Sequence, residues 1–260
     1  MPMIDADGCL LHVSVEGRQG GPTLMLSNSL GCTLQMWQPQ MKALTQLFRV
    51  IRYDRRGHGK SGVPPGPYSM DRFGRDVLAI LDDLNIDKVH WCGLSMGGMV
   101  GQWLGANAPE RIGKLILANT ACYYPDPTNW LNRIRAVRQG GIEGVADAVM
   151  ASWLTADFRE REPQATATMR AMLIASPVEG YLAACEALST LDQRALLPRI
   201  KSQTLVIAGR HDQSTPIAAG ELIRSQIPGA ALTILDAAHL SNVEQPHAFA
   251  DTVAGFLMQR

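Results

Sequence analysis

Short apolar segments recur along the chain and predict the strands of one sheet. Residues 9–17 alternate apolar and polar side chains, which is typical of a strand, and residues 23–27 are apolar throughout, as in a strand buried on both faces. The same reasoning predicts later strands, which cover residues 48–54, 88–93, 114–119, 204–209 and 231–236.

Helical spacing of apolar residues appears between these strands. Phe73, Val77 and Ile80 share one face of a helix predicted over residues 70–86. Further helices are predicted over residues 96–109, 216–227 and 247–260. Alternation of strands and helices with short connections predicts an α/β fold, with a mostly parallel central sheet covered by helices on both faces.

The middle of the chain breaks this alternation. Residues 122–195 are rich in Met, Arg and Ala and show helical patterns without a convincing strand. We therefore expect a core made of residues 1–121 and 196–260, with residues 122–195 inserted as a helical cap.

Charge and composition exclude several classes of function. The 260 residues include 24 Lys plus Arg and 24 Asp plus Glu, so the formal net charge is zero. Nucleic-acid and membrane partners are not expected, because no basic run and no apolar run of about 18 residues occurs. The first 17 residues lack the basic and apolar regions of a signal peptide, so a cytoplasmic location is expected.

The chain contains 5 cysteines, an odd number at irregular spacing and without a C-x-x-C pair. This pattern favours reduced, buried thiols over a disulfide framework or a zinc site. The cysteines are Cys9, Cys32, Cys92, Cys122 and Cys185.

Ser95 stands at the predicted junction between a strand and a helix, within the motif Gly93-Leu94-Ser95-Met96-Gly97. The pattern G-x-S-x-G is the nucleophile elbow, in which a strained turn lifts the serine hydroxyl clear of the sheet. Glycine is expected at positions 93 and 97 because side chains there would collide as the strand and helix close up. Gly98 and Gly101 would let the helix pack closely on the sheet.

A nucleophilic serine needs an imidazole as base and a carboxylate that orients the imidazole. Asp212 follows the predicted strand 204–209, and His239 follows the strand 231–236. Both stand in loops at the carboxyl ends of later strands, in the chain order Ser, acid, His. We therefore predict a catalytic triad of Ser95, Asp212 and His239, and no metal site.

The other histidines are expected to have no role as the base. His12 and His90 fall within strands, and His247 begins the last helix. His211 precedes the candidate acid in the chain, and His58 is expected to brace its own Gly-rich turn.

The oxyanion formed during acyl transfer needs two N–H donors. The residue after the nucleophile, Met96, supplies the first. The second is expected from Leu30, in the loop that follows the strand 23–27. The alternative is that this loop is an ordinary turn containing glycine.

The chain resembles the α/β-hydrolase fold superfamily from end to end. Residues 54–61, DRRGHGKS, look like its D-x-R-G-x-G-x-S turn, and residues 93–98 look like its elbow. Residues 209–212 and 238–239 look like its acid and base loops.

A closer resemblance is to the 3-oxoadipate enol-lactonases, and it includes the cap. It is carried by residues 27–40 (SNSLGCTLQMWQPQ), 117–134 (LANTACYYPDPTNWLNRI) and 152–160 (SWLTADFRE). Cys32 departs from the small polar residue expected there. The resemblance implies hydrolysis of a five-membered enol lactone with a carboxymethyl arm to 3-oxoadipate, in the β-ketoadipate pathway of aromatic degradation. It also implies that no metal or organic cofactor is required.

The carboxylate of such a small-molecule substrate needs a cation. Trp130 and Arg133 match a W-x-x-R pattern that we associate with the cap of this subfamily, and they are the favoured substrate-binding residues. Trp130 and Trp153 could equally be ordinary cap core. The other candidate cations of the cap are Arg135, Arg138, Arg159 and Arg161.

Two other classes of function stay open at this point. A carboxylesterase or a carbon–carbon bond hydrolase would share the triad and differ in the cap, whereas a receptor on the same scaffold would bind without turnover. A haloalkane dehalogenase is disfavoured, because it needs a carboxylate where this chain has Ser95. The sequence does not indicate an oligomeric state.

Overall fold

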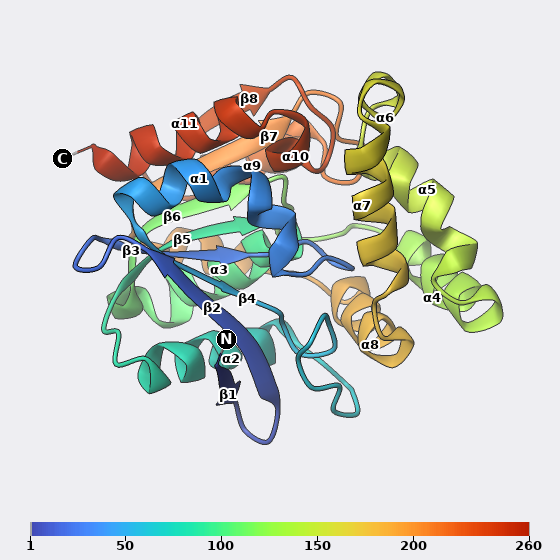
Figure 1. The fold of residues 1–260 in the computed structure, drawn as a ribbon, viewed down its shortest axis with the longest axis horizontal. Coiled ribbons are helices and arrows are strands. Elements are labelled where there is room, and N and C mark those ends of the chain that lie inside the picture. The colour runs from blue at the N-terminus through green and yellow to red at the C-terminus, as the bar shows by residue number, and fades with distance from the viewer. Residues whose placement is uncertain (1, 260) are drawn as a thin grey trace.

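The computed structural model describes residues 2–259 and contains one eight-stranded sheet (Figure 1). The strand order is β1-β2-β4-β3-β5-β6-β7-β8, and all neighbours pair in parallel except β1 with β2 and β2 with β4. The strands are β1 Met3–Asp5, β2 Leu10–Gly17, β3 Thr23–Ser27, β4 Arg49–Tyr53, β5 Val89–Leu94, β6 Ile112–Ala118, β7 Thr204–Gly209 and β8 Ala231–Leu235.

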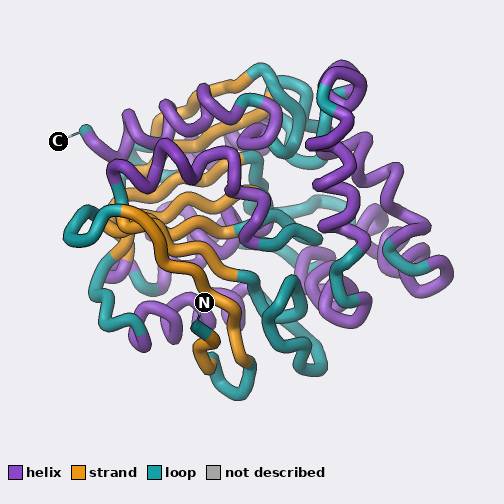
Figure 2. Tube along the Cα trace, viewed as in Figure 1, coloured by secondary structure: helices purple, strands orange, loops and turns teal. Residues whose placement is uncertain are grey.

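Helices cover both faces of this sheet. Helices α1 and α11 contact each other over one face, whereas α3 packs on β5 and β6 and also contacts α2 (Figures 1 and 2). The core helices are α1 Gln38–Leu47, α2 Met70–Asp83, α3 Met96–Asn107, α9 Ile217–Gln226, α10 Ser241–Glu244 and α11 Pro246–Met258. Short 3-10 turns are η1 Leu34–Trp37, η2 Pro109–Arg111 and η3 Arg194–Arg199. The predicted α/β architecture with a mostly parallel sheet is confirmed.

The segment between β6 and β7 is helical and lies beyond one end of the sheet, at the right of Figure 1. This segment is described throughout, and its β pairing consists of one isolated bridge between Tyr123 and Asp192. The division into a core and a cap of residues 122–195 stays our proposal. The helices of this segment are α4 Thr128–Gly140, α5 Glu143–Trp153, α6 Ala156–Arg161, α7 Pro163–Ile174 and α8 Val178–Ser189.

Strand β1 and helix α1 are among the elements that were not expected from the sequence. Strand β1 has three residues, too few for a pattern to be visible. Helix α1 buries Gln40 together with Met41 and Leu44, so its buried face includes a polar residue. The Gln40 amide is accommodated because it donates a 2.6 Å hydrogen bond to the backbone oxygen of Asn242. Apolar periodicity alone therefore misses this helix.

Membrane-spanning potential is limited to one bent pair of helices. Within residues 2–259, no single helix has both the length and the apolar character to cross a bilayer. Helices α7 and α8 are long and apolar enough only when they are taken together, and a bend of 91° separates them.

Candidate active site

Ser95 occupies a strained turn between β5 and α3. Its backbone has φ 57° and ψ −117°, a conformation that non-glycine residues rarely adopt. Hydrogen bonds hold the turn on both sides: Ser95 N–H donates to Ala118 O at 2.8 Å, and Thr120 Oγ1 donates to Ser95 O at 2.7 Å. The turn therefore presents the Ser95 side chain beyond the carboxyl end of the sheet.

Glycines allow the close contacts that this turn requires. A β-carbon at Gly93 would lie 2.0 Å from the carbonyl oxygen of Gly97, so the predicted collision of strand and helix is confirmed. A β-carbon at Gly97 would lie 2.2 Å from Ser27 O, which places the obstacle in β3 and not in the strand that leads into the turn. Both positions are closed to any side chain.

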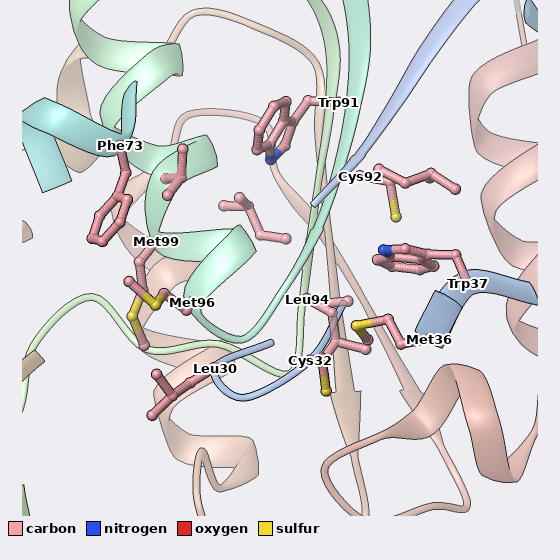
Figure 3. Packing of buried hydrophobic residues seen from close by; sticks show 14 of the residues in the cluster. Leu30, Cys32, Met36, Trp37, Phe73, Trp91, Cys92, Leu94, Met96 and Met99 are labelled. Atoms are coloured by element: carbon pink, nitrogen blue, oxygen red, sulfur yellow. The ribbon is translucent and has the colours of Figure 1, made fainter. Parts of the chain in front are cut away.

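Helix α3 packs closely on the sheet through its next two glycines. A β-carbon at Gly98 would meet the Thr120 side chain at 2.6 Å, and one at Gly101 would meet Trp91 Nε1 at 2.5 Å. Trp91 turns its indole nitrogen toward the helix, where it donates a 3.1 Å hydrogen bond to Gly97 O (Figure 3). The close packing expected for Gly98 and Gly101 is thus present.

Asp212 and His239 meet at the carboxyl ends of β7 and β8. His239 Nδ1 lies 2.9 Å from Asp212 Oδ2, and both residues are buried. The same oxygen accepts hydrogen bonds from Thr215 Oγ1 at 2.6 Å and Asn119 Nδ2 at 3.0 Å. The other oxygen, Oδ1, accepts from the backbone N–H groups of Ser214 and Thr215 at 2.8 and 2.9 Å.

These donors decide the ionisation of Asp212. Burial alone would raise the pKa of this carboxyl, but the charge and hydrogen bond of His239 and the hydrogen bonds of Thr215 outweigh it, so the pKa lies below its usual value. An ionised Asp212 can only accept, which puts the imidazole proton on His239 Nδ1. The Nε2 atom is then left as the basic nitrogen.

Ser95 and His239 line the same cavity. Across residues 2–259 the Ser95 hydroxyl makes no hydrogen bond, so proton transfer would require the pair to close. Hydrogen bonds between catalytic groups are often long in unliganded enzymes and tighten when substrate binds. The structure thus brings the three predicted triad residues to one place, and their catalytic roles remain a proposal.

Both predicted oxyanion donors have an unengaged backbone N–H group. In the described chain, Leu30 N–H and Met96 N–H form no hydrogen bond, although both residues are buried. The neighbours of Leu30 are engaged: Ser29 N–H contacts Met36 Sδ at 3.3 Å, and Gly31 N–H donates to His58 Nε2 at 3.1 Å. Leu30 and Ser95 line the same cavity.

This cavity has a volume of about 380 Å³ and extends from Ser95 into the cap. The Arg133 guanidinium lies 5.1 Å from the centre of the Trp130 ring, a cation–π distance, and both side chains line the cavity. Further lining residues are Ser29, Leu30, Tyr124, Asp126, Asn129, Ser152, Trp153, Tyr181, Gln213, Ser214 and His239.

The other cap arginines do not line this cavity. Arg138 is exposed and pairs with Glu186 at 2.9 Å, and Arg161 pairs with Asp157 at 2.9 Å. Arg135 is also exposed, and Arg159 is half-buried. Trp153 combines both roles considered for it, since it is buried in the cap core and also lines the cavity.

The remaining histidines lie outside the cavity. His58 is fully buried, and its Nδ1 contacts Arg56 O of its own turn at 3.4 Å, as expected. Its Nε2 accepts the Gly31 N–H of a neighbouring loop, which was not expected. His12 Nδ1 contacts Asp54 Oδ2 at 2.8 Å. The others are bound to backbone or surface groups or are exposed: His90 accepts from Lys114 N–H, His211 contacts Asp236, and His247 is exposed.

Thiols and metal ligands do not form a second site in the described residues. All five cysteines are buried and unpaired, as expected. Burial raises the pKa of the Cys32 thiol to about 12, so this residue stays a neutral apolar neighbour of the Leu30 loop. Residues 2–259 contain no group of three or more His, Cys, Asp or Glu side chains that could hold a metal ion.

Sequence reasoning missed the residues that connect these loops. Asn119 Nδ2 donates to both Asp212 Oδ2 and Ala238 O, so it joins the acid and base loops. Glu244 accepts from the backbone N–H of Ala238 at 2.7 Å and from that of Thr155, which ties the base loop to the cap. Asn119 follows the last residue of β6, and this position at the functional edge of the sheet was the available signal.

Comparisons with known proteins agree with this architecture. A model of the alpha/beta hydrolase fold family matches residues 20–246. The chain is 41% identical over 246 residues to 3-oxoadipate enol-lactonase 2 of Acinetobacter baylyi, which covers 95% of this chain and 92% of that protein. It is 32% identical over 259 residues to a putative carbamate hydrolase, RutD, of Caulobacter segnis, with coverage of 96% and 97%.

A solved structure resembles the whole fold. The crystal structure of the enol-lactonase from Burkholderia xenovorans LB400 superposes with a TM-score of 0.97 at 42% sequence identity. The match covers 99% of this chain and 100% of that one, so it includes the helical segment as well as the sheet.

Proposed function

This chain belongs to the alpha/beta hydrolase fold family, and from that premise we propose that it is a serine hydrolase that opens 3-oxoadipate enol-lactone to 3-oxoadipate. The observation that carries the proposal is the composition of one cavity: Ser95 and His239 line it together with the cap residues Trp130 and Arg133. Enol-lactonase relatives that match both sheet and cap support the choice of substrate.

Acylation begins with the Ser95 hydroxyl. His239 Nε2 removes its proton while Ser95 Oγ attacks the lactone carbonyl carbon. Asp212 holds the imidazole in the required tautomer through the 2.9 Å hydrogen bond to Nδ1 and stabilises the imidazolium that forms. The new Ser95 Oγ–carbon bond gives a tetrahedral intermediate.

The intermediate collapses by breaking the ring ester bond. Leu30 N–H and Met96 N–H stabilise its oxyanion, and losing one such donor typically costs about 3 kcal/mol of barrier. The ring oxygen leaves as an enol that takes up the proton from His239 and tautomerises to the ketone. His239 then activates a water that attacks the acyl carbon, so that 3-oxoadipate is released and the Ser95 hydroxyl is restored.

The substrate carboxylate is proposed to bind Arg133. No carboxylate of residues 2–259 forms an ion pair with this guanidinium, so it is available to an anionic ligand inside the cavity. A charge-assisted hydrogen bond to a guanidinium is stronger than one between neutral groups, which would favour a lactone with an acidic arm over a neutral ester.

The location of the protein is proposed to be the cytoplasm. Its five cysteines are unpaired, and a reducing compartment keeps thiols in this state.

The decisive experiment is hydrolysis of 3-oxoadipate enol-lactone by wild type and by Ser95→Ala, compared with a neutral aryl ester. We expect efficient, Ser95-dependent opening of the lactone and a kcat/KM for it well above that for the ester. Preference for the aryl ester would favour a general carboxylesterase. Lactone binding without turnover in the wild type would favour a receptor.

A further inference from the structure

Arg55 carries a buried charge without a carboxylate partner. The two neighbouring buried arginines are both paired, Arg52 with Glu16 and Arg56 with Asp76, each at 2.6 Å. Arg55 is 2% exposed, yet no acidic group in the described chain lies within ion-pairing distance of it. Burial of an unpaired cation is costly, so the surroundings of this guanidinium must compensate by other means.

The compensating groups are two backbone carbonyls of the loop that carries Leu30. Arg55 Nη1 donates to Ser29 O at 3.3 Å, and Nη2 donates to Asn28 O. The Phe73 ring lies 5.9 Å from the guanidinium carbon, and Nε has no hydrogen-bond partner in the described chain. The hydrogen bonds of this buried cation are thus directed to one short segment.

That segment contains the candidate oxyanion donor. Ser29 C=O and Leu30 N–H belong to the same peptide group, and a hydrogen bond to the oxygen of an amide polarises its N–H. Chains of hydrogen bonds in a low-dielectric interior strengthen one another in this way. A cation on Ser29 O therefore makes Leu30 N–H a better donor, toward a cavity that also contains Ser95.

A second contact holds the same loop and is favoured by the same charge. His58 Nε2 must be unprotonated to accept the Gly31 N–H at 3.1 Å. Burial and, next, the nearby charge of Arg55 lower the pKa of His58 to about 3, so the ring stays neutral over the working range of pH. Arg55 and His58 together fix the peptide groups on both sides of Leu30.

We infer that Arg55 is a positioning residue of the oxyanion hole, which orients and polarises the Ser29–Leu30 peptide so that it stabilises negative charge in the transition state. The inference rests on the proposed function, because it requires a tetrahedral oxyanion on a substrate bound to Ser95. It predicts that loss of the Arg55 charge weakens the transition state and leaves ground-state binding nearly unchanged.

The test uses the acyl-enzyme itself. A 4-nitrophenyl ester with a ¹³C-labelled carbonyl is mixed rapidly with wild type, Arg55→Met, Arg55→Lys and the control Arg56→Lys, and the carbonyl stretch of the acyl group on Ser95 is followed by infrared difference spectroscopy. Stronger N–H donors lower this frequency. Steady-state kcat and KM for the lactone are measured on the same proteins, and circular dichroism verifies folding.

We expect Arg55→Met to raise the acyl carbonyl frequency and to lower kcat about tenfold or more, with KM within about twofold of wild type. Lysine keeps the charge but loses the fork that spans two carbonyls, so Arg55→Lys should fall between Arg55→Met and wild type. Arg56 pairs with Asp76, so Arg56→Lys should keep the wild-type carbonyl frequency.

The outcomes separate this inference from the proposed function. If wild type forms no acyl band and its turnover of the ester does not depend on Ser95, the serine mechanism fails and the role of Arg55 fails with it. If wild type forms the band and the Arg55 variants share its frequency and kcat, the positioning role alone is overturned. Should Arg55→Met not fold, Arg55→Lys decides: a frequency and kcat equal to wild type overturn the inference, and a shift absent from Arg56→Lys supports it.

Discussion

His239 and Asp212 form a 2.9 Å hydrogen bond between Nδ1 and Oδ2, although they lie 27 positions apart in the chain. Asp212 accepts further hydrogen bonds from Thr215, Ser214 and Asn119, so its carboxylate is held in place from several sides. A base oriented by a fixed carboxylate presents Nε2 in one direction only. The proposed chemistry depends on this rigidity, because the Ser95 hydroxyl must transfer its proton to that nitrogen within the same cavity.

Asp212→Asn tests the orientation of the base. An asparagine fits the same space, but its amide can donate to Nδ1 and so favour the tautomer with the proton on Nε2. We expect kcat for the lactone to fall about 10⁴-fold, with little change in stability or KM. Steady-state kinetics and thermal unfolding of the purified variant check this. A loss below tenfold would argue against the assigned role of Asp212.

Ser95→Ala and His239→Ala test whether the two residues act as a unit. Each single variant should lose about 10⁴- to 10⁶-fold in kcat, and the double variant should be scarcely slower than either, because neither group works without the other. Residual rates measured at high enzyme concentration would show this. If the two losses multiply, Ser95 and His239 act independently and the proposed triad is wrong.

Much of the sheet and the placement of the site follow from rules that act locally along the sequence. Strands such as β3 and β7 are continuous apolar runs, and the structure places both at the residues that the pattern predicts. Parallel strands bring their carboxyl ends to one edge, so Asp212 and His239 could be expected near Ser95 from chain order alone.

The residues that the sequence did not reveal are those whose partners are distant or unusual. Asn119 is bonded to Asp212, 93 residues away, and nothing in its own segment marks that partner. Arg55 belongs to a motif, yet burial of an arginine without a carboxylate partner is unfavourable because of its desolvation cost. Neither composition nor periodicity could therefore predict its position beside the Leu30 loop.

Arg133→Ala tests recognition of the substrate carboxylate. Loss of the Arg133 guanidinium should lower kcat/KM for the enol-lactone about 10- to 100-fold, which is the value of a charged hydrogen bond. The kcat/KM for a neutral aryl ester should stay within about twofold of wild type. Arg138→Ala is the matched control, since Arg138 lies on the same helix but is exposed and paired with Glu186. Equal losses of Arg133→Ala on both substrates would indicate damage to the cap instead of lost recognition.

Gly97→Ala and Gly144→Ala should shift stability in opposite directions. A β-carbon at Gly97 would lie 2.2 Å from the backbone oxygen of Ser27, so alanine there should lower the free energy of unfolding by about 3 kcal/mol or more. A β-carbon at Gly144, within helix α5, meets no atom within 4 Å, so alanine should raise this free energy by up to about 1 kcal/mol. Urea unfolding measures both, and a stable Gly97→Ala variant would contradict the close packing of the elbow.

His58 should make the protein lose stability in acid. Burial and the charge of Arg55 lower the pKa of folded His58 from 6.5 to about 3, so between these pH values the unfolded chain binds a proton that the folded chain does not. The contribution to stability is complete above pH 6.5 and is lost as the pH falls toward about 3, with a slope of at most about 1.4 kcal/mol per pH unit.

Glutamine offers an oxygen for the Gly31 N–H without titrating in this range. Urea unfolding at several pH values between about 6.5 and 4 should therefore give a shallower slope for His58→Gln than for wild type. Parallel curves for the two proteins would mean that folded His58 is protonated as easily as unfolded His58, and that the Leu30 loop does not depend on a neutral ring.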